Sequence, residues 1–328
     1  MRMNEAALRD WLARATGDAA LRITVLTRLS GGAIQQNWAL DVEGAGGAQR
    51  WVLRSDAPAV LAVSHSRAAE FALLRAAKDA GVMVPAPLYL CDDRAAIGRP
   101  FFVMSRVEGI AAAHRVVKMF PANGDVIVHA LGAQLAKLHG IRPPRDDLAF
   151  LGEPPADSAR ACIAAMRARL DAAGTPRPVL EWGLRALERA TPPPLPPVLC
   201  HNDFRVGNIM LTTDRVVAVL DWEFAGWGDP HADLGWFCAK CWRFGNVAME
   251  AGGIGTRAAF ETGYEAHHPI DRARLPWWEL FATIRWAVIA ADQAIRHISG
   301  EERSLELALT GHIVPELEWD ILAMVEAL

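Results

Sequence analysis

Polar side chains interrupt two short apolar runs in the stretch LCHNDFRVGNIML, residues 199–211. Buried polar groups are costly unless they are paired, so an insertion of this kind needs either hydrogen-bond partners or a function. Asp203 and Asn208 lie five residues apart in this stretch, and Asp221 follows thirteen residues later. Taken by itself, the stretch is most simply interpreted as a polar turn between two strands.

Together, these three residues offer the groups that magnesium-assisted phosphoryl transfer requires. Asp203 could accept the proton of a hydroxyl group, and Asn208 and Asp221 carry the oxygen ligands that Mg²⁺ prefers. The segment NIMLTTDRVVAVLD predicts a hairpin that turns at Thr213 and Asp214. Such a hairpin would hold its two ends, Asn208 and Asp221, side by side, which gives the polar insertion a reason.

The elements that must position these residues divide the chain into a strand-rich part and a helical part. In the first part we expect strands at 20–29, 34–42, 50–55, 86–92 and 99–109, a glycine-rich linker at 43–49 and a helix at 64–81. In the second we expect helices at 124–141, 157–173 and 179–190 and beyond Pro230, with a strand at 215–223. The predicted fold class is α+β, with an antiparallel-sheet lobe at 1–108 and a larger, mainly helical lobe at 109–328.

The pattern H-x-D-x-x-x-x-N, followed by an aspartate at the end of a strand, resembles the catalytic loop of the aminoglycoside phosphotransferase and choline kinase group. The wording CHNDFRVGN leans toward the choline kinases, and LDWEFAGWGDPHADLGWF resembles the broader phosphotransferase family. This resemblance covers most of the chain and implies a two-lobed, protein-kinase-like fold that uses ATP and Mg²⁺. It implies Asp203 as the catalytic base, Asn208 and Asp221 as metal ligands, and His201 as a residue that holds the loop backbone.

Upstream landmarks of the same family fall in the expected order. LSGGA takes the place of the glycine-rich loop, where Gly31 and Gly32 would let backbone amides approach the phosphates. Arg54 stands where relatives usually carry a phosphate-binding lysine, and Glu70 stands where they carry its acidic partner. This is a departure, because arginine is longer and planar and does not replace lysine freely. An unpaired surface arginine is the alternative.

The strand FFVMSRVEG resembles the hinge between the lobes. Met104 would lie behind the adenine, and the Ser105 carbonyl and the Val107 amide would hydrogen-bond its edge. An ordinary strand followed by a connector explains this stretch nearly as well.

Three further polar residues near the loop have open roles. Asp233 is expected to tie down the catalytic loop from the start of a helix, with helix capping as the alternative. Glu223 could assist a second metal ion, although a solvated carboxylate is the simpler interpretation. Arg205 could contact phosphate or neutralise nearby acids.

Composition restricts the classes of function. The 328 residues include 34 basic and 38 acidic side chains, a net charge of −4, which gives no indication of a nucleic-acid surface. No apolar run approaches the length of about 18 residues that a membrane span needs. The N-terminal MRMNEAALRDWLARA predicts a helix and not a signal peptide. Five scattered cysteines favour reduced thiols in the cytoplasm, and Cys238 and Cys241 are expected to pack within one helix instead of binding metal.

The predicted activity is that of a small-molecule kinase, which moves the γ-phosphoryl group of ATP to a hydroxyl. Aminoglycosides would need an acidic pocket, whereas choline or another amino alcohol would need an aromatic cage, which twelve tryptophans could supply. Trp277, Trp278 and Trp286, however, have helical spacing and are expected in the core. Related domains fused to acyl-CoA dehydrogenases suggest a hydroxyacyl-CoA. A catalytically silent nucleotide-binding pseudokinase is the rival, motivated by Arg54.

Overall fold

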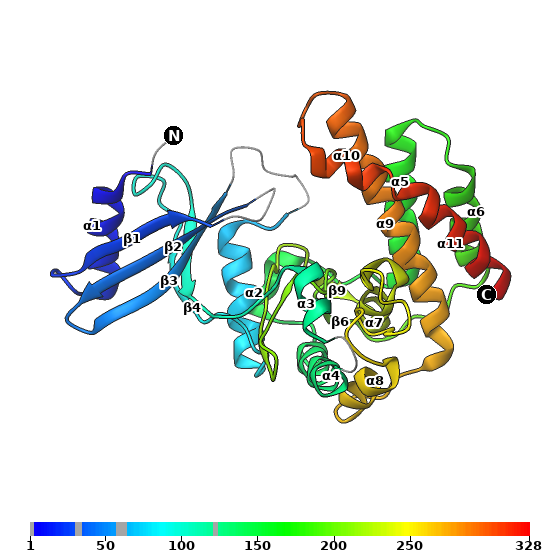
Figure 1. Cartoon of the computed structure of the whole chain (residues 1–328), viewed down its shortest axis with the longest axis horizontal. Helices are drawn as coiled ribbons and strands as arrows, with labels where there is room; N and C mark the ends of the chain where they lie inside the picture. The colour runs from blue at the N-terminus through cyan, green and yellow to red at the C-terminus, as the bar shows by residue number, and fades with distance from the viewer. Residues whose placement is uncertain (1–2, 30–34, 57–63, 121–123) are drawn as a thin grey trace.

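The computed structural model describes residues 3–29, 35–56, 64–120 and 124–328, which form a sheet-based lobe and a larger helical lobe (Figure 1). The sheet is antiparallel with five strands in the order β1-β2-β3-β5-β4. The strands are β1 (Arg22–Arg28), β2 (Gln35–Gly44), β3 (Gly47–Asp56), β4 (Pro87–Cys91) and β5 (Phe101–Ser105). The expected fold class is confirmed.

The glycine-rich segment expected as a linker is instead the turn of a long hairpin. β2 and β3 remain paired to their ends, where Gly44 lies opposite Gly47. Gly47 has a φ of 82°, which a glycine adopts at no steric cost and which suits a tight hairpin turn. The sequence prediction was therefore wrong about this segment, and β3 begins three residues earlier than expected.

Two helices cover the sheet. α1 (Glu5–Thr16) begins after its cap, Asn4, and buries Leu8 and Leu12 against the sheet residues of the N-terminal core. α2 (Arg67–Asp79) begins after the capping residue Ser66, and it lies between the sheet and the helical lobe (Figure 1). Leu73 of α2 belongs to the largest core, which continues into the helical lobe. Because α2 packs against the sheet and against the helical lobe, it links the positions of the two lobes.

The helical lobe combines helices with two short antiparallel strand pairs. The helices are α3 (Ala113–Met119), α4 (Asp125–His139), α5 (Ser158–Ala173), α6 (Pro178–Arg189), α7 (His231–Cys238), α8 (Arg257–Glu265), α9 (Leu275–Ile298), α10 (Leu305–Gly311) and α11 (Val314–Ala327). The strands are β6 (Val198–Cys200), which pairs with β9 (Gly226–Gly228), and β7 (Ile209–Leu211), which pairs with β8 (Val216–Val219). The expected helices at 124–141, 157–173 and 179–190 are confirmed.

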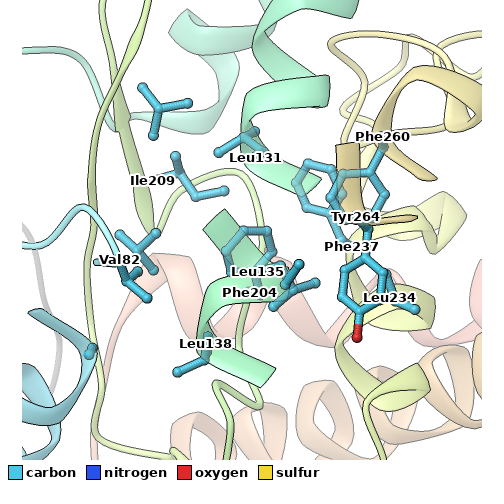
Figure 2. Close-up of a cluster of buried hydrophobic side chains, with 14 of the residues drawn as sticks. Val82, Leu131, Leu135, Leu138, Phe204, Ile209, Leu234, Phe237, Phe260 and Tyr264 are labelled. Atoms are coloured by element: carbon cyan, nitrogen blue, oxygen red, sulfur yellow. The ribbon is translucent and has the colours of Figure 1, made fainter. Parts of the chain in front are cut away.

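The largest core forms where α4 meets the segments that carry the polar loop. Leu131 and Leu135 of α4 gather with Phe204, Phe237 and Tyr264 in this core (Figure 2). Phe204 follows Asp203 directly in the chain and is fully buried. The loop that carries the polar residues is therefore fastened to the lobe by an apolar anchor.

A second core joins α5, α6, α9 and α11. Trp277 and Trp278 are buried in it, as expected, whereas Trp286 is only partly buried and packs on Trp242 with ring centroids 4.6 Å apart. Among the described helices none combines the length and the apolar character that crossing a membrane would require.

The C-x-x-C segment does not form one continuous helix. α7 ends at Cys238, because Ala239 adopts an extended ψ of 139°, and Cys241 lies in the separate 3-10 turn Lys240–Trp242. Both thiols are free, and burial raises the pKa of each to about 12. The predicted shared helix face is therefore wrong.

Candidate active site

Asp203 lies in the loop between β6 and β7, and three side chains donate hydrogen bonds to it. Its Oδ1 accepts from Arg205 Nε at 2.9 Å and from Trp236 Nε1 at 3.0 Å. Its Oδ2 accepts from Asn208 Nδ2 at 2.5 Å. The carboxylate is buried, with 8% relative exposure, so these bonds fix its direction.

The β7–β8 hairpin turns where the sequence predicted it. The main-chain N–H of Thr212 donates to the carbonyl of Arg215 at 3.0 Å, which closes a turn over Thr213 and Asp214. β8 ends at Val219, however, two residues before Asp221, so the expected strand at 215–223 is wrong at its end. Asp221 has a φ of 65°, a left-handed conformation that an extended strand cannot contain.

The hairpin brings Asn208 beside the segment that carries Asp221. The N–H of Leu220 donates to the Asn208 carbonyl at 2.7 Å. The Asn208 side-chain amide nitrogen is occupied, since it donates to the main-chain carbonyl and the carboxylate of Asp203. The side-chain oxygen of Asn208 is therefore the atom that it can offer to a cation.

Arg54 is buried in a network of ion pairs and is not a surface residue. Its Nε lies 2.8 Å from Glu70 Oε1, and another guanidinium nitrogen lies 2.6 Å from Asp221 Oδ1. Arg67 also pairs with Glu70, and its Nε lies 2.9 Å from Asp56 Oδ1. The pairing of Arg54 with Glu70 was expected. The contacts of Arg67 were missed, although its spacing of three residues from Glu70 on one helix is a recognisable signal.

The network keeps Asp221 ionised. Burial acts to raise the pKa of Asp221, but the charge and the hydrogen bond of Arg54 outweigh it and hold that pKa below its usual range. Burial likewise acts to lower the pKa of Arg54, and the neighbouring Glu70 and Asp221 raise it instead. At neutral pH, Asp221 is therefore a carboxylate, the form in which it can bind a metal ion.

Asp233 fastens the loop between β6 and β7 through hydrogen bonds to its main chain. Its Oδ2 accepts from the N–H of His201 at 2.7 Å and faces His139 Nε2 at 3.1 Å, and its Oδ1 accepts from the N–H of Asn202 at 2.8 Å. Burial acts to raise the pKa of Asp233, but its hydrogen bond and charge interaction with His139 outweigh it and lower that pKa. Both Asp233 carboxylate oxygens accept from main-chain N–H groups of the loop, so these hydrogen bonds hold the loop and do not cap α7.

His201 links the loop to the end of β8. Its Nδ1 accepts from the N–H of Asp203 at 3.2 Å, so Nε2 carries the proton that it donates to the Leu220 carbonyl at 3.0 Å. Both ring nitrogens are thus engaged by main-chain groups. This arrangement fits the structural role that the family resemblance implied for His201.

The segment after Asp221 also contacts the start of α2. The N–H of His65 donates to the Glu223 carbonyl at 3.1 Å, and the His65 ring lies 2.7 Å from the Ala225 carbonyl. Glu223 itself is buried, so its interpretation as a solvated carboxylate is wrong. The position of α2, and with it Glu70, is coupled to the segment that carries Asp221.

The remaining predicted residues lie in or after β5 or outside the described part of the chain. Ser105 ends β5 and is tied to Ala86, whose carbonyl accepts from its N–H at 2.9 Å. Met104 packs partly buried against the largest core, and Val107 follows the strand. Their adenine contacts stay predictions. Gly31 and Gly32 lie outside the described residues.

Two indole rings and two guanidinium groups lie near Asp203, and of these the sequence indicated only Arg205. The Arg205 guanidinium lies 4.8 Å from the ring centroid of Trp242, and that of Arg285 lies 4.4 Å from the ring centroid of Trp236. The two indoles are 5.0 Å apart. Of the two roles left open for Arg205, the structure places it on an acid, Asp203.

Comparisons with known proteins show which family and which fold the chain resembles. A family model described as the phosphotransferase enzyme family matches residues 25–278. Acyl-CoA dehydrogenase family member 10 of Mus musculus is 27% identical over 280 residues, which are 80% of this chain and 26% of that protein. The chain thus spans about a quarter of the length of that relative.

Solved structures share the fold. A candidate aminoglycoside phosphotransferase of Ralstonia eutropha superposes with a TM-score of 0.79 at 23% identity, covering 99% of each chain. A thermostable variant of another aminoglycoside phosphotransferase, in a ternary complex with AMP-PNP and hygromycin B, gives a TM-score of 0.60 at 15% identity and covers 98% of each chain.

Proposed function

The chain belongs to the phosphotransferase enzyme family, and we propose from this premise that it moves the γ-phosphoryl group of ATP to a hydroxyl of a small molecule. The observation that carries the proposal is the assembly of Asp203, Asn208 and Asp221 by one loop and one hairpin. Asp203 bonds to Asn208, and the Asn208 main chain bonds to the residue before Asp221. A silent nucleotide-binding pseudokinase would have no need of an oriented Asp203.

In this proposal, Asp203 orients the acceptor hydroxyl and takes its proton. The three donors to its carboxylate fix that orientation before the acceptor arrives, so little reorganisation remains for the reaction. The Asn208 amide oxygen and the ionised Asp221 are hard oxygen donors, a set that fits Mg²⁺. These two residues would hold the ion, which when bound neutralises charge on the phosphates.

The nucleotide would lie on the side of the sheet lobe, residues 1–108. Arg54 would contact the α- and β-phosphates, with Glu70 fixing its direction, and Gly31 and Gly32 would approach them from the glycine-rich loop. The hinge residues Met104, Ser105 and Val107 would hold the adenine. The relative solved with AMP-PNP supports a nucleotide in this fold.

The acceptor could be an amino alcohol such as choline or a hydroxyacyl-CoA. The name of the acyl-CoA dehydrogenase relative supports the second. A choline cage would need free indole faces, but one face of Trp236 and one of Trp242 each carry a guanidinium. A screen of alcohols, amino alcohols and hydroxyacyl-CoAs for stimulated ATP turnover distinguishes these classes.

The substitution Asp203→Asn tests catalysis. Asparagine is nearly isosteric but cannot accept the proton, so we expect phosphoryl transfer to fall by roughly 10²-fold or more at near-normal ATP affinity. The matched control is Asp214→Asn, which alters an exposed aspartate in the turn of the neighbouring hairpin and should leave the rate unchanged. Full transfer activity in Asp203→Asn would exclude Asp203 as the base.

The substitution Asp221→Ala tests the metal site. In the wild type, ATP with Mg²⁺ at about 100 times the dissociation constant should stabilise the fold by about 2.7 kcal/mol through mass action. Asp221→Ala should lose most of that gain, measured as the shift in Tm relative to each protein with EDTA and no ATP. An equal shift in both proteins would remove Asp221 from the metal site.

A further inference from the structure

Arg285 of α9 is a partly buried arginine to which the described residues supply no counter-ion. Within the described parts of the chain its guanidinium makes no hydrogen bond and no ion pair, and it lies against the face of Trp236. The buried arginines behave differently, since each pairs with a carboxylate: Arg54, Arg67, Arg243 and Arg274. Removing a charged group from water costs free energy unless a group of opposite charge pairs with it.

The position of Arg285 relates it to the proposed base. The indole of Trp236 separates the two, because Arg285 stacks on its ring while its Nε1 donates to Asp203. Burial lowers the pKa of Arg285, and the charge of Asp203 acts in the opposite direction without a direct ion pair. Arg285 is therefore near Asp203 and yet not neutralised by it.

A second guanidinium reinforces the positive charge on this side. Arg205 Nε donates to Asp203, while its guanidinium lies on Trp242, the indole that packs on Trp236. Two cations thus adjoin a single carboxylate, and that carboxylate already accepts three hydrogen bonds. Arg205 is paired with that carboxylate, so Arg285 is the guanidinium that remains available to attract an anion.

We propose that Arg285, assisted by Arg205, binds an oxyanion of the acceptor, so that the substrate is a hydroxylated carboxylate or phosphate and not an amino alcohol or an aminoglycoside. A guanidinium binds carboxylate and phosphate through two parallel N–H donors, and stacking on an indole holds its plane in one orientation. The proposal names the substrate class for the proposed phosphoryl transfer and rests on it. Arg285 would be a specificity-determining residue.

Four matched acceptor series test the proposal. Each series consists of straight-chain alcohols with one terminal group: a carboxylate, a phosphate, a neutral amide or an ammonium group. The chain lengths are the same in all four series. Turnover is measured by ADP release with ATP and Mg²⁺, and binding by thermal shift without nucleotide. We expect the carboxylates or the phosphates to exceed the amides in kcat/KM by about tenfold to a hundredfold, the range for hydrogen bonds to charged groups. Whichever series leads identifies the oxyanion.

Variants of Arg285 assign the preference to this residue. Arg285→Gln should abolish it through a higher acceptor KM with an unchanged ATP KM, Arg285→Lys should keep part of it, and Arg285→Glu should favour the ammonium series. The matched control is Arg160→Gln, which removes an exposed arginine of α5. Thermal unfolding verifies that each variant folds.

The proposal is overturned if wild type treats anions and amides alike, responds to neither, or prefers the ammonium series. It is also overturned if Arg285→Gln retains the anion preference. Preferred transfer to cationic alcohols would contradict this inference and leave the phosphotransferase proposal intact. Preferential binding of the anions without any phosphoryl transfer would contradict the phosphotransferase proposal and leave the anion site intact.

Discussion

At the scale of single residues, Arg54 illustrates what an arginine can do in the place of a lysine. Its guanidinium carries five N–H donors in a rigid fork, so it can hold Glu70 and Asp221 at the same time. Glu70 also pairs with Arg67, which leaves it compensated when Arg54 is absent. Among the described residues, Arg54 is the one side chain that donates a hydrogen bond to the Asp221 carboxylate. Arg54 therefore matters more to Asp221 than to Glu70.

Truncation of Arg54 should weaken nucleotide binding selectively. We expect Arg54→Ala to weaken ATP by about 1.5–3 kcal/mol and adenosine hardly at all, because only the phosphates lose a charged hydrogen-bond donor. Arg54→Lys should fall between wild type and alanine, since a point charge survives without the fork. Glu70→Gln should reproduce part of the loss. Calorimetric titration of all four proteins with ATP and adenosine measures these differences.

Adenosine is the internal control for that experiment, because it reports misfolding without involving the phosphates. Equal ATP affinity in wild type and Arg54→Ala would mean that Arg54 serves only the ion-pair network. A parallel loss of adenosine would point instead to a damaged lobe.

At the scale of elements, the helices that support the polar loop depend on how closely α4 approaches α8. Gly132 of α4 faces the Phe260 carbonyl so closely that an added Cβ would overlap it, and Gly263 of α8 stands in the same relation to the His129 carbonyl. Both helices therefore present a glycine to the backbone of the other. This approach keeps His139, at the end of α4, within 2.8 Å of the Tyr264 hydroxyl.

A methyl group at Gly132 should destabilise the fold. Alanine normally stabilises a helix by about 0.5–1 kcal/mol relative to glycine, but overpacking against a backbone carbonyl costs about 1–3 kcal/mol. We expect Gly132→Ala to lower the free energy of unfolding in urea. The control is Gly46→Ala in the β2–β3 turn, where a Cβ meets open space. A Gly132→Ala protein more stable than wild type would show that the helices can move apart freely.

At the scale of the whole molecule, one buried carboxylate joins four segments. Asp233 of α7 contacts both His139 of α4 and the loop that carries Asp203, and His139 in turn contacts Tyr264 of α8. The pKa of Asp233 is lowered in the folded protein, because burial is outweighed by its hydrogen bond and charge interaction with His139. The ionised form of Asp233 is thus part of what holds the helical lobe together.

This network predicts a loss of stability in acid. A carboxylate whose pKa is lower in the folded state than the unfolded value of about 3.9 contributes fully above that value and progressively less as the pH falls through it. We expect the free energy of unfolding in urea to decline between about pH 5 and pH 3, with Asp233 accounting for up to about 1.4 kcal/mol per pH unit. Asp233→Asn should flatten the decline by that amount.

The exposed Asp92 provides the matched control. Asp92→Asn should keep the wild-type acid dependence. An unchanged slope in Asp233→Asn would show that other carboxylates dominate the acid transition, of which Asp229 is one whose pKa is also lowered despite burial, by its hydrogen bond with His231.

The sequence by itself determined the local features of the protein. The polar loop around Asp203, the turn at Thr213 and Asp214 and the helices of the second lobe all depend on residues close in the chain, where spacing fixes geometry. The same local patterns identified the family and its two-lobed fold. They failed where a single residue changes the backbone, as at Ala239 in the C-x-x-C segment, or where strand pairing extends into a glycine-rich turn, as at Gly47.

The tertiary structure alone decided which distant groups meet. Arg54 and Asp221 are 167 residues apart in the chain and form one ion pair. Nothing in the local sequence around either residue predicts that β3 and the segment after β8 will meet. Arg285 gave no signal in the sequence, because an arginine on a helix is usually solvated. Arg285 lies partly buried on Trp236 and has no counter-ion among the described residues. Both facts follow from the packing of the whole chain and not from local spacing.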